Sequence, residues 1–239
     1  LENIISIKIK FSNCVAEKEK EFQLQVGDFL FQDLDSSPLC EAIESVTPGY
    51  NNGNFSHVGI IIKGGDPILQ NVDSKFEEQY FYNEQQEYRV LEAIPAEVTT
   101  TRLDSFLNDS LDSINNPKVI VGRLKLEYRY LIKDAIRFLN GKIGVKYDDE
   151  FLLNNKKYYC SELIYEAFKK EDVFELAPMN FMNKENKIMP IWQNYYDKLN
   201  MKVPQGELGI NPGLMSISNK IDIIYDFTKT KNFKYSKNE

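Results

Sequence analysis

At positions 160–168 the chain reads CSELIYEAF, a short amphipathic segment that opens with a cysteine. Cys160 and the apolar residues Leu163, Ile164, Ala167 and Phe168 recur at the spacing of one helix face. We therefore predict a helix that begins near Cys160 and turns this side chain toward the core. Taken alone, a cysteine on such a face is more often a small buried hydrophobic residue than a nucleophile.

The predicted place of Cys160 at a helix N-terminus also suits it to chemistry. The first N–H groups of a helix have no intrahelical acceptor, and the positive end of the helix dipole stabilises a thiolate. The same N–H groups can donate hydrogen bonds to the negative oxygen of a tetrahedral intermediate. Cys160 is therefore a candidate nucleophile if a base lies beside it.

The chain contains one histidine, His57, so any mechanism that needs an imidazole must use it. His57 opens the run HVGIII, which predicts a buried strand, although a histidine there is often just a satisfied polar residue at a sheet edge. Glu92 lies within RVLEAI, and a carboxylate buried among such neighbours needs a partner. A histidine N–H is a suitable partner, and the pairing would orient the ring. The alternative is that Glu92 faces solvent from an edge strand.

Apolar runs near turn residues predict five strands. They span residues 28–34, 57–63, 88–94, 118–124 and 221–227. Residues 5–11 also alternate apolar and polar side chains, which predicts a half-buried strand rather than a signal peptide. The segment that ends at Cys14 resembles a lipoprotein cleavage site only weakly, because two lysines interrupt it.

Helical patterns predict three further helices. The first spans residues 38–46 after a cap at Ser36 or Ser37, the second follows a cap at Thr101, and the third spans residues 128–140 and ends at Gly141. Several strands with segregated helices indicate an α+β fold.

Residues 171–219 have a different texture, with four prolines in a stretch rich in Asn and Met. We predict a long loop excursion around a single domain that covers residues 1–239, followed by a flexible tail at residues 228–239. A loop that shapes a binding site and an ordinary surface insertion are both consistent with this pattern.

Composition excludes several classes of function. The chain has 29 Lys and Arg against 36 Asp and Glu, a net charge of −7, so it lacks the basic footprint of a nucleic-acid partner. Its three cysteines form no C-x-x-C pair, which argues against a disulfide scaffold and against a cysteine zinc site. No apolar run approaches the length of about 18 residues that a membrane span needs.

Other candidate sites are weaker. Gly27-Asp28 more often makes a turn into a strand than takes part in catalysis, and Cys40 lies inside a predicted helix as a structural residue. The glycines of Gly141-Lys142-Ile143-Gly144 do not match a phosphate-binding loop.

Several short motifs together resemble the papain-like NlpC/P60 cysteine hydrolases, and in particular their YiiX/YebB-like branch. The motifs are VGDFLF at 26–31, FSHVGI at 55–60, VLEA at 90–93, GVKYD at 144–148 with Phe151, and YYCSEL at 158–163. In ordinary members of that superfamily the cysteine helix precedes the Gly-Asp and histidine strands. Here it follows both, which is the order of the circularly permuted branch. The resemblance implies an antiparallel sheet or barrel packed against helices.

The resemblance also implies roles for single residues. Cys160 corresponds to the nucleophile, His57 to the base and Glu92 to the residue that orients the base. A tyrosine near the oxyanion is implied too, but Tyr147, Tyr158 and Tyr159 all remain candidates. The related lecithin retinol acyltransferase group has a second histidine at the third position, which this chain lacks.

The implied reaction is hydrolysis of an amide through a thioester, with no metal and no organic cofactor. A cell-wall peptide or another small amide is the leading substrate class, and a lipid-like acyl group is the second. A membrane-directed acyl hydrolase or acyltransferase, and a non-catalytic binding module that keeps the cleft, are the rival functions. The cell envelope or the extracellular space is the location that the resemblance favours, with the cytoplasm as the alternative; the oligomeric state stays open.

Overall fold

The computed structural model describes residue 22 and residues 24–35, 37–63 and 88–229. Four sequence expectations lie outside the described residues. They concern the strand at residues 5–11, the cleavage site at Cys14, the cap at Ser36 and the tail beyond residue 229.

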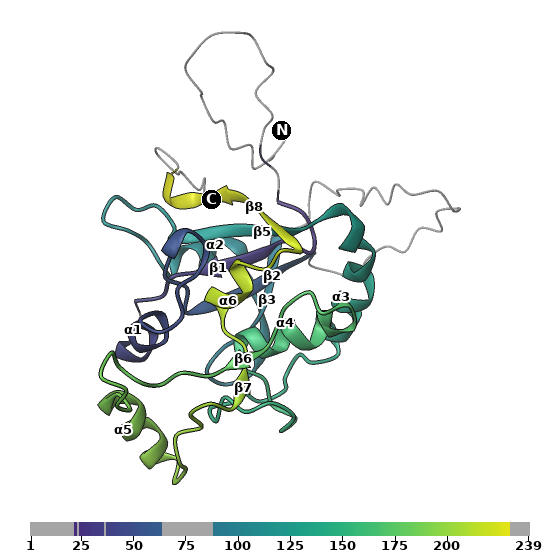
Figure 1. Cartoon of the computed structure of the whole chain (residues 1–239). Coiled ribbons are helices and arrows are strands. Elements are labelled where there is room, and N and C mark those ends of the chain that lie inside the picture. The colour runs from purple at the N-terminus through teal and green to yellow at the C-terminus, as the bar shows by residue number, and fades with distance from the viewer. Residues whose placement is uncertain (1–21, 23, 36, 64–87, 230–239) are drawn as a thin grey trace.

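Six antiparallel strands form one sheet in the order β4-β3-β2-β1-β5-β8 (Figure 1). The strands are β1 (Phe29–Gln32), β2 (His57–Lys63), β3 (Tyr88–Ala93), β4 (Val98–Arg102), β5 (Val119–Leu124) and β8 (Ile221–Asp226). Five of them are the predicted strands, and each of their ends lies within two residues of the expected one. The expected α+β fold with an antiparallel sheet is thus confirmed.

Helices cover both faces of this sheet. The alternating side chains of β1 show how: Phe29 and Phe31 join the core under α3 (Ile132–Asn140) and α4 (Cys160–Phe168), while Leu30 packs on the other face with α2 (Leu103–Asn108). This period of two is the reason that one strand serves two cores. The arrangement carries the N-terminus of α4 to the sheet, because α4 lies across β2 and β3.

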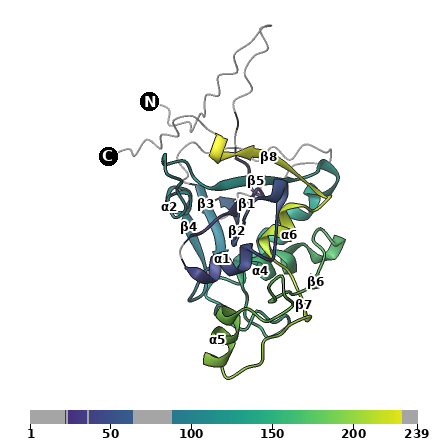
Figure 2. The ribbon, with the colours of Figure 1, turned by 60° about the vertical axis from the view of Figure 1, so that its left-hand side comes forward.

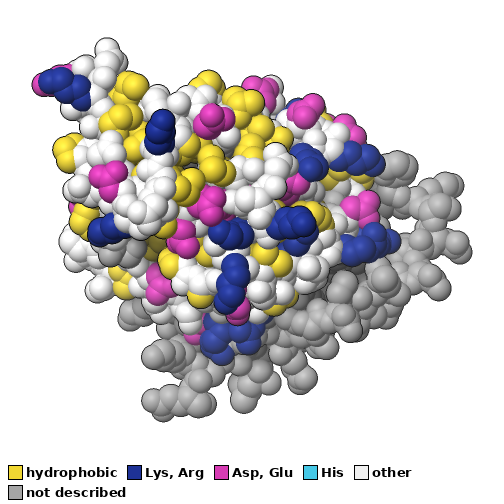
Figure 3. Space-filling view, turned by 90° about the horizontal axis from the view of Figure 1, so that it is seen from below, with side chains coloured by type: hydrophobic (Ala, Val, Ile, Leu, Met, Phe, Trp, Pro, Cys, Tyr) yellow, Lys and Arg dark blue, Asp and Glu magenta, His cyan; other side chains and the backbone are white. Residues whose placement is uncertain are grey.

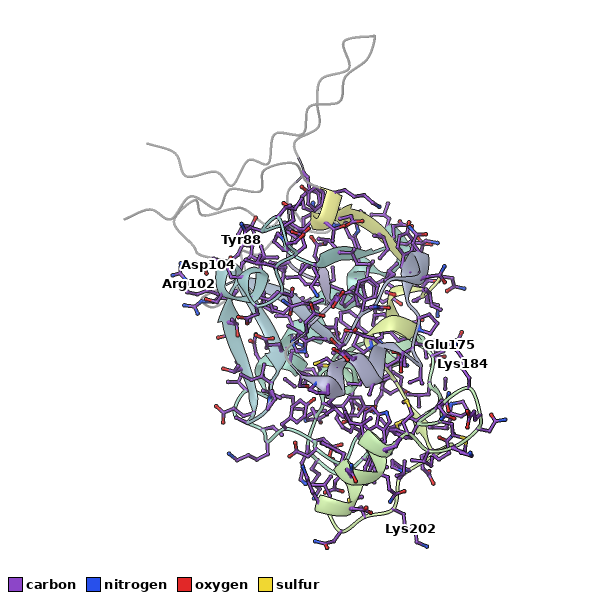
Figure 4. All side chains as sticks on the ribbon, turned by 90° about the vertical axis from the view of Figure 1, so that its left-hand side faces the viewer. Tyr88, Arg102, Asp104, Glu175, Lys184 and Lys202 are labelled. Carbon is purple, nitrogen blue, oxygen red and sulfur yellow. The ribbon has the colours of Figure 1, made fainter. Side chains whose placement is uncertain are left out.

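The expected cap at Thr101 is wrong, because Thr101 lies in β4, where it pairs with Val90 of β3. Three consecutive threonines favour a strand, since β-branched side chains suit a pleated surface. The cap of α2 is Arg102, which makes no capping hydrogen bond. Its guanidinium instead donates two hydrogen bonds of 2.9 Å to Asp104, and the two side chains lie together at the start of the helix (Figure 4).

Two other helix predictions are right in place but differ in detail. The segment expected as a helix over residues 128–140 begins as a 3-10 turn, η2 (Leu126–Leu131), and continues as α3 up to Gly141. The first helix, α1 (Pro38–Glu44), starts after Ser37, whose side chain makes no capping hydrogen bond.

The excursion at residues 171–219 contains secondary structure that the sequence patterns miss. It forms α5 (Pro190–Lys198), α6 (Pro212–Ser216) and the short pair β6 (Ala177–Pro178) and β7 (Leu208–Gly209). Proline stands at the first position of both helices, where its missing N–H costs nothing, so these prolines begin helices rather than interrupt the chain.

A small hydrophobic cluster holds α5 against α1. It contains Ala42, Phe181, Trp192 and Tyr196, all buried, and it is separate from the two cores of the sheet. Figures 1 and 2 both place α5 at the lower end of the molecule, away from the six strands. The excursion is therefore built around its own packed side chains.

The turn at Gly27-Asp28 is structural, as expected. Gly27 has a φ of +93°, and a Cβ atom there would lie 2.8 Å from Ile132 Cδ1. Asp28 is buried and accepts hydrogen bonds of 2.6 and 2.7 Å from Arg123 of β5. This ion pair joins the start of β1 to its neighbouring strand.

Candidate active site

Cys160 is the first residue of α4, as the sequence pattern predicts. The preceding Tyr159 has an extended backbone (φ −88°, ψ 168°), and its carbonyl accepts the first helical hydrogen bond from Leu163 at 3.0 Å. The amide of Cys160 therefore belongs to the first turn, whose N–H groups have no intrahelical acceptors. Cys160 is buried, with 6% of its surface exposed.

His57 and Glu92 form a buried pair. The distance between His57 Nε2 and Glu92 Oε2 is 2.6 Å, and the two residues are 7% and 5% exposed. Ile60 of β2 pairs with Leu91 of β3, so Glu92 lies opposite Gly59 and diagonal to His57 on the same face of the sheet. Because Glu92 is buried and β4 covers the outer side of β3, the alternative of a solvent-facing edge residue is wrong.

The thiol of Cys160 lies close enough to the imidazole of His57 to act on its pKa as a hydrogen-bond partner and as a charge. Since Nε2 is bonded to Glu92, Nδ1 is the nitrogen left for the thiol. Burial on its own lowers the pKa of His57, but the hydrogen bonds to Cys160 and Glu92 and the charges of both groups outweigh it and raise the pKa to about 10. The ring is thus held as an imidazolium between two acidic groups at neutral pH.

Phe106 of α2 packs beside the imidazole, with 5.8 Å between the ring centroids. The close approach depends on Gly59, because a Cβ atom there would lie 3.1 Å from Phe106 Cε2 and would overlap Val90 Cγ1. Gly59 therefore leaves room both for the strand next to it and for the ring that packs on His57.

We expect Gly59→Ala to lower the free energy of unfolding by about 1–3 kcal/mol, because overpacking a dense core forces its neighbours apart. Displacing Phe106 should also slow the reaction of Cys160 with iodoacetamide. Thermal unfolding and alkylation rates would measure the two effects. Gly141→Ala is a suitable control, because this exposed glycine has a φ of −70° and no atom closer than 3.3 Å to the added Cβ. Equal stability of the two variants would contradict the packing argument.

Ser56 is a site residue that the sequence patterns do not single out. Its carbonyl accepts a weak hydrogen bond from Cys160 Sγ at 4.0 Å, and its hydroxyl accepts one from the amide of Leu34 at 3.0 Å. Ser56 also lies beside the carboxyl of Glu44, a buried residue of α1; burial raises the pKa of this carboxyl, and Ser56 acts against that shift as a hydrogen-bond partner. The segment before His57 is thus held from β1 and from α1.

The structure separates the three candidate tyrosines. Tyr147 and Tyr159 line the cavity that contains Cys160, whereas Tyr158 packs edge-on against Phe138 and does not line it. The hydroxyl of Tyr159 accepts a hydrogen bond from the amide of Ile210 at 3.3 Å. The backbone amide of Tyr147 donates to the carbonyl of Ala96, but its hydroxyl has no hydrogen-bond partner within the described part of the chain. Burial, followed by the charge of Cys160, raises the pKa of this hydroxyl well above the usual value. Both hydroxyls keep a proton to donate, but only that of Tyr147 is without any hydrogen bond among the described residues.

The cavity beside Cys160 is largely apolar and has a volume of about 270 Å³. Its walls come from distant segments, including Val46 of the chain after α1, Trp192 of α5 and Leu214 of α6. No Asp, Glu, Lys, Arg or His is among the described residues that line it. Figure 3 views the molecule from below. On the face seen there, hydrophobic side chains gather with charged side chains around them. The excursion thus forms part of the wall of the cavity.

Residues 147–158, which we name the 147–158 loop, lead from Tyr147 to the start of α4. Asp148 is fully buried and accepts hydrogen bonds from the amides of Glu150 and Leu152 and from Asn155 Nδ2, at 2.8 to 3.0 Å. The hydroxyls of Tyr195 and Tyr196 of α5 donate to backbone carbonyls on the outer side of the loop. The loop is therefore braced from within and by the excursion.

Comparison with known proteins identifies the chain. A family model described as permuted papain-like amidase enzyme, YaeF/YiiX, C92 family, matches residues 23–225. The chain belongs to this family. The C92 model covers β1 to β7, the helices α1 to α6 and all but the last residue of β8. A cysteine-hydrolase function of the amidase type is thus established at the level of the family.

Structural comparison agrees on the fold of this C92 family member. A crystal structure of YiiX from Escherichia coli O157:H7, described as a metalloprotein, superposes with a TM-score of 0.62 at 19% identity. The match covers 86% of this chain and 98% of that chain. A comparison with curated protein sequences found no match.

Two further findings concern the described residues only. Their histidine, cysteine and acidic side chains form no group of three or more that could hold a metal ion. None of their helices is long and apolar enough to cross a membrane.

Proposed function

We propose that the chain is a cysteine amidase in which Cys160 is the nucleophile, His57 the general base and acid, and Glu92 the group that orients His57. The observation that carries the proposal is the position of the chain's single imidazole, which is hydrogen-bonded to Glu92 at 2.6 Å and lies beside the thiol of Cys160. A nucleophile, a base and a third group that orients the base are the parts that covalent acyl transfer needs. The amidase family to which the chain belongs supports the same assignment.

The reaction follows from this geometry. The thiolate of Cys160 attacks the amide carbonyl carbon, and the carbonyl oxygen becomes an oxyanion. The amide N–H of Cys160 and the hydroxyl of Tyr147 are the donors placed to receive that charge. The imidazolium of His57 then protonates the leaving nitrogen, the C–N bond breaks, and a thioester with Cys160 remains. His57 next takes a proton from water, which attacks the thioester, releases the carboxylic acid and regenerates the thiol.

The cavity supports a preference for an uncharged, apolar acyl group. A charged group placed there would lose its hydration without gaining an ionic partner, because no charged side chain is among the described residues that line the cavity. A cell-wall peptide would have to place an uncharged portion in this cavity. The same observation favours a second candidate function, the hydrolysis of lipid-like acyl esters.

The described residues do not fit a metal centre of the kind that the word metalloprotein suggests for YiiX. Transition metals are held by several His, Cys or carboxylate ligands, and the described residues offer no such group. The single histidine of the chain is already engaged with Cys160 and Glu92. Each proposed step therefore uses only groups of the protein, the substrate and water.

A series of N-acyl-4-nitroanilides tests the preference of the cavity. We expect kcat/KM to rise roughly fourfold for each methylene added between acetyl and hexanoyl, because burying a methylene contributes about 0.8 kcal/mol. The succinyl anilide should be a poor substrate despite the length of its acyl group, because succinyl carries a carboxylate. Lys184→Ala, at an outward-pointing residue of the excursion, provides the control variant (Figure 4).

The outcomes separate the candidate functions. Turnover of the matching 4-nitrophenyl esters and of vesicle-borne esters, but not of the anilides, would favour the lipid-directed hydrolase. No acylation of Cys160 by any member of either series would favour a binding module and would overturn the proposed function.

A further inference from the structure

Glu162 is a buried acid that the proposed mechanism does not use. It lies two residues after Cys160 on the first turn of α4 and is only 2% exposed. Its Oε2 has no hydrogen-bond partner within the part of the chain that the structure describes. A buried carboxyl with an unsatisfied oxygen is costly, so its place beside the thiol calls for an explanation.

The contacts of Glu162 reach two segments at once. The backbone N–H groups of Tyr159 and Asn154 lie close enough to its carboxyl to act on its pKa as hydrogen-bond donors. Tyr159 is the cap of α4, so the first contact is the reciprocal half of a capping box and fixes the start of the helix. Asn154 belongs to the 147–158 loop, so the second contact ties that loop to the same point.

The 147–158 loop has a backbone that needs such ties. Phe151, Asn154 and Lys156 all have φ values between +56° and +67°, a region that costs free energy for residues other than glycine. Phe151 is the bulkiest of them, and its ring packs against Tyr159 at 5.5 Å and Trp192 at 6.3 Å. Since Tyr147 begins this loop, whatever holds the loop on α4 also sets the position of the Tyr147 hydroxyl relative to Cys160.

The electrostatic surroundings keep the carboxyl neutral at pH 7. Burial, and then the charge of Asp148 from the loop, raise the pKa of Glu162 to about 8, and Glu166 on its own helix adds to the effect. Burial, and then the charges of Glu162 and Cys160, in turn raise the pKa of Tyr159. A neutral Glu162 places no negative charge beside a thiolate, whereas an ionised one would repel both that thiolate and Asp148.

We propose that Glu162 is a positioning residue for acylation: by joining the backbone of Tyr159 to that of Asn154, its carboxyl holds the 147–158 loop on α4 and keeps the Tyr147 hydroxyl in place for the oxyanion. This inference rests on the proposed roles of Cys160 and Tyr147. It assigns Glu162 a part in the acylation step and none in the formation of the thiolate.

Two reactions of Cys160 separate these steps. Alkylation by iodoacetamide needs a thiolate but no oxyanion donor, whereas acylation by 4-nitrophenyl butyrate needs both. We expect Glu162→Ala, at a pH of about 6.5, to lower the acylation rate at least about tenfold and to change the alkylation rate less than about threefold. Mass spectrometry of the Cys160 peptide would measure both rates on the full chain.

Glu162→Gln provides a second readout that a purely structural role would not move. Its amide oxygen can accept the same two hydrogen bonds, so acylation at a pH of about 6.5 should be largely restored. Wild-type acylation should fall above a pH of about 8, where Glu162 ionises, while the Gln variant should keep its rate until His57 loses its proton near pH 10. Glu175→Gln, at an exposed acidic residue that does not act on Glu162, should behave as the wild type.

Each result supports or overturns the inference. Equal loss of acylation and alkylation in Glu162→Ala would mean that Glu162 only stabilises the helix. Identical pH profiles for the wild type and Glu162→Gln would mean that the ionisation of Glu162 does not affect the acylation rate. Wild-type acylation that Glu162→Ala leaves unchanged would overturn this inference alone. A wild type that is alkylated but never acylated would overturn the proposed function first, and this inference with it.

Discussion

Cys160→Ser is expected to abolish thioester formation and to lower amide hydrolysis by at least about 10⁴-fold, in the range that loss of a covalent nucleophile produces. A serine hydroxyl has nearly the same size as a thiol, so the packing of α4 against the sheet should persist. A hydroxyl ionises far less readily than a thiol, so the variant lacks the anion that the proposed mechanism uses. Mass spectrometry of the acylated protein and the rate of anilide hydrolysis would measure the loss.

Cys40→Ser is the matched control for this experiment. Cys40 is half-buried in α1, where its sulfur lies 3.5 Å from the hydroxyl of Ser37, and it does not line the cavity. We expect this variant to retain wild-type activity and alkylation of Cys160. An acyl adduct on Cys40, or substantial hydrolysis by Cys160→Ser, would show that another group is the nucleophile.

The elements that carry the nucleophile and the base could be predicted from local patterns. Cys160 opens an apolar helix face and His57 opens an apolar run, so the same periodicity that defines each element also defines where it begins. Glu92 could be assigned because a carboxylate within a buried strand needs a partner and the chain has one histidine. In each of these cases the information lies within a few residues of the side chain concerned.

The remaining parts of the site depend on contacts between distant segments. The position of Tyr147 in the cavity wall depends on the bridge that sets it beside Tyr158 and on the left-handed residues of the 147–158 loop, which no periodicity encodes. Glu162 fits the polar positions of an amphipathic helix, so its burial is visible only once the loop covers it. The part of the cavity wall that α5 forms could not be predicted from the sequence patterns, because a proline can either begin a helix or interrupt one.

Glu92→Gln is expected to lower acylation by roughly 10²–10⁴-fold, because an uncharged amide neither stabilises the imidazolium nor enforces one tautomer. In the wild type, burial lowers the pKa of His57, and the bonds and charges of Cys160 and Glu92 raise it to about 10. Removing the charge of Glu92 leaves the effect of burial less opposed, so the pKa of His57 should fall. The ion pair with Cys160 then weakens, and alkylation at neutral pH should slow.

The pH dependence of alkylation distinguishes this cause from a general loss of structure. With Glu92→Gln we expect a rate that is low at neutral pH and rises through the range in which free thiols ionise, near a pH of about 8.5. Glu175→Gln, at an exposed acidic residue that does not line the cavity, should leave the wild-type profile unchanged (Figure 4). A Glu92→Gln profile that matches the wild type would mean that Glu92 does not act on His57.

Stability should change over a related pH range with a defined sign. The pKa of His57 is raised from 6.5 to about 10 by folding, so the stabilisation it represents is complete below pH 6.5 and disappears as the pH rises toward 10. Glu92→Gln removes most of this contribution. The difference in free energy of unfolding between the wild type and the variant should therefore be largest below pH 6.5 and shrink toward pH 10. A difference that grows with pH would show that Glu92 stabilises the fold by a route other than the protonated imidazole.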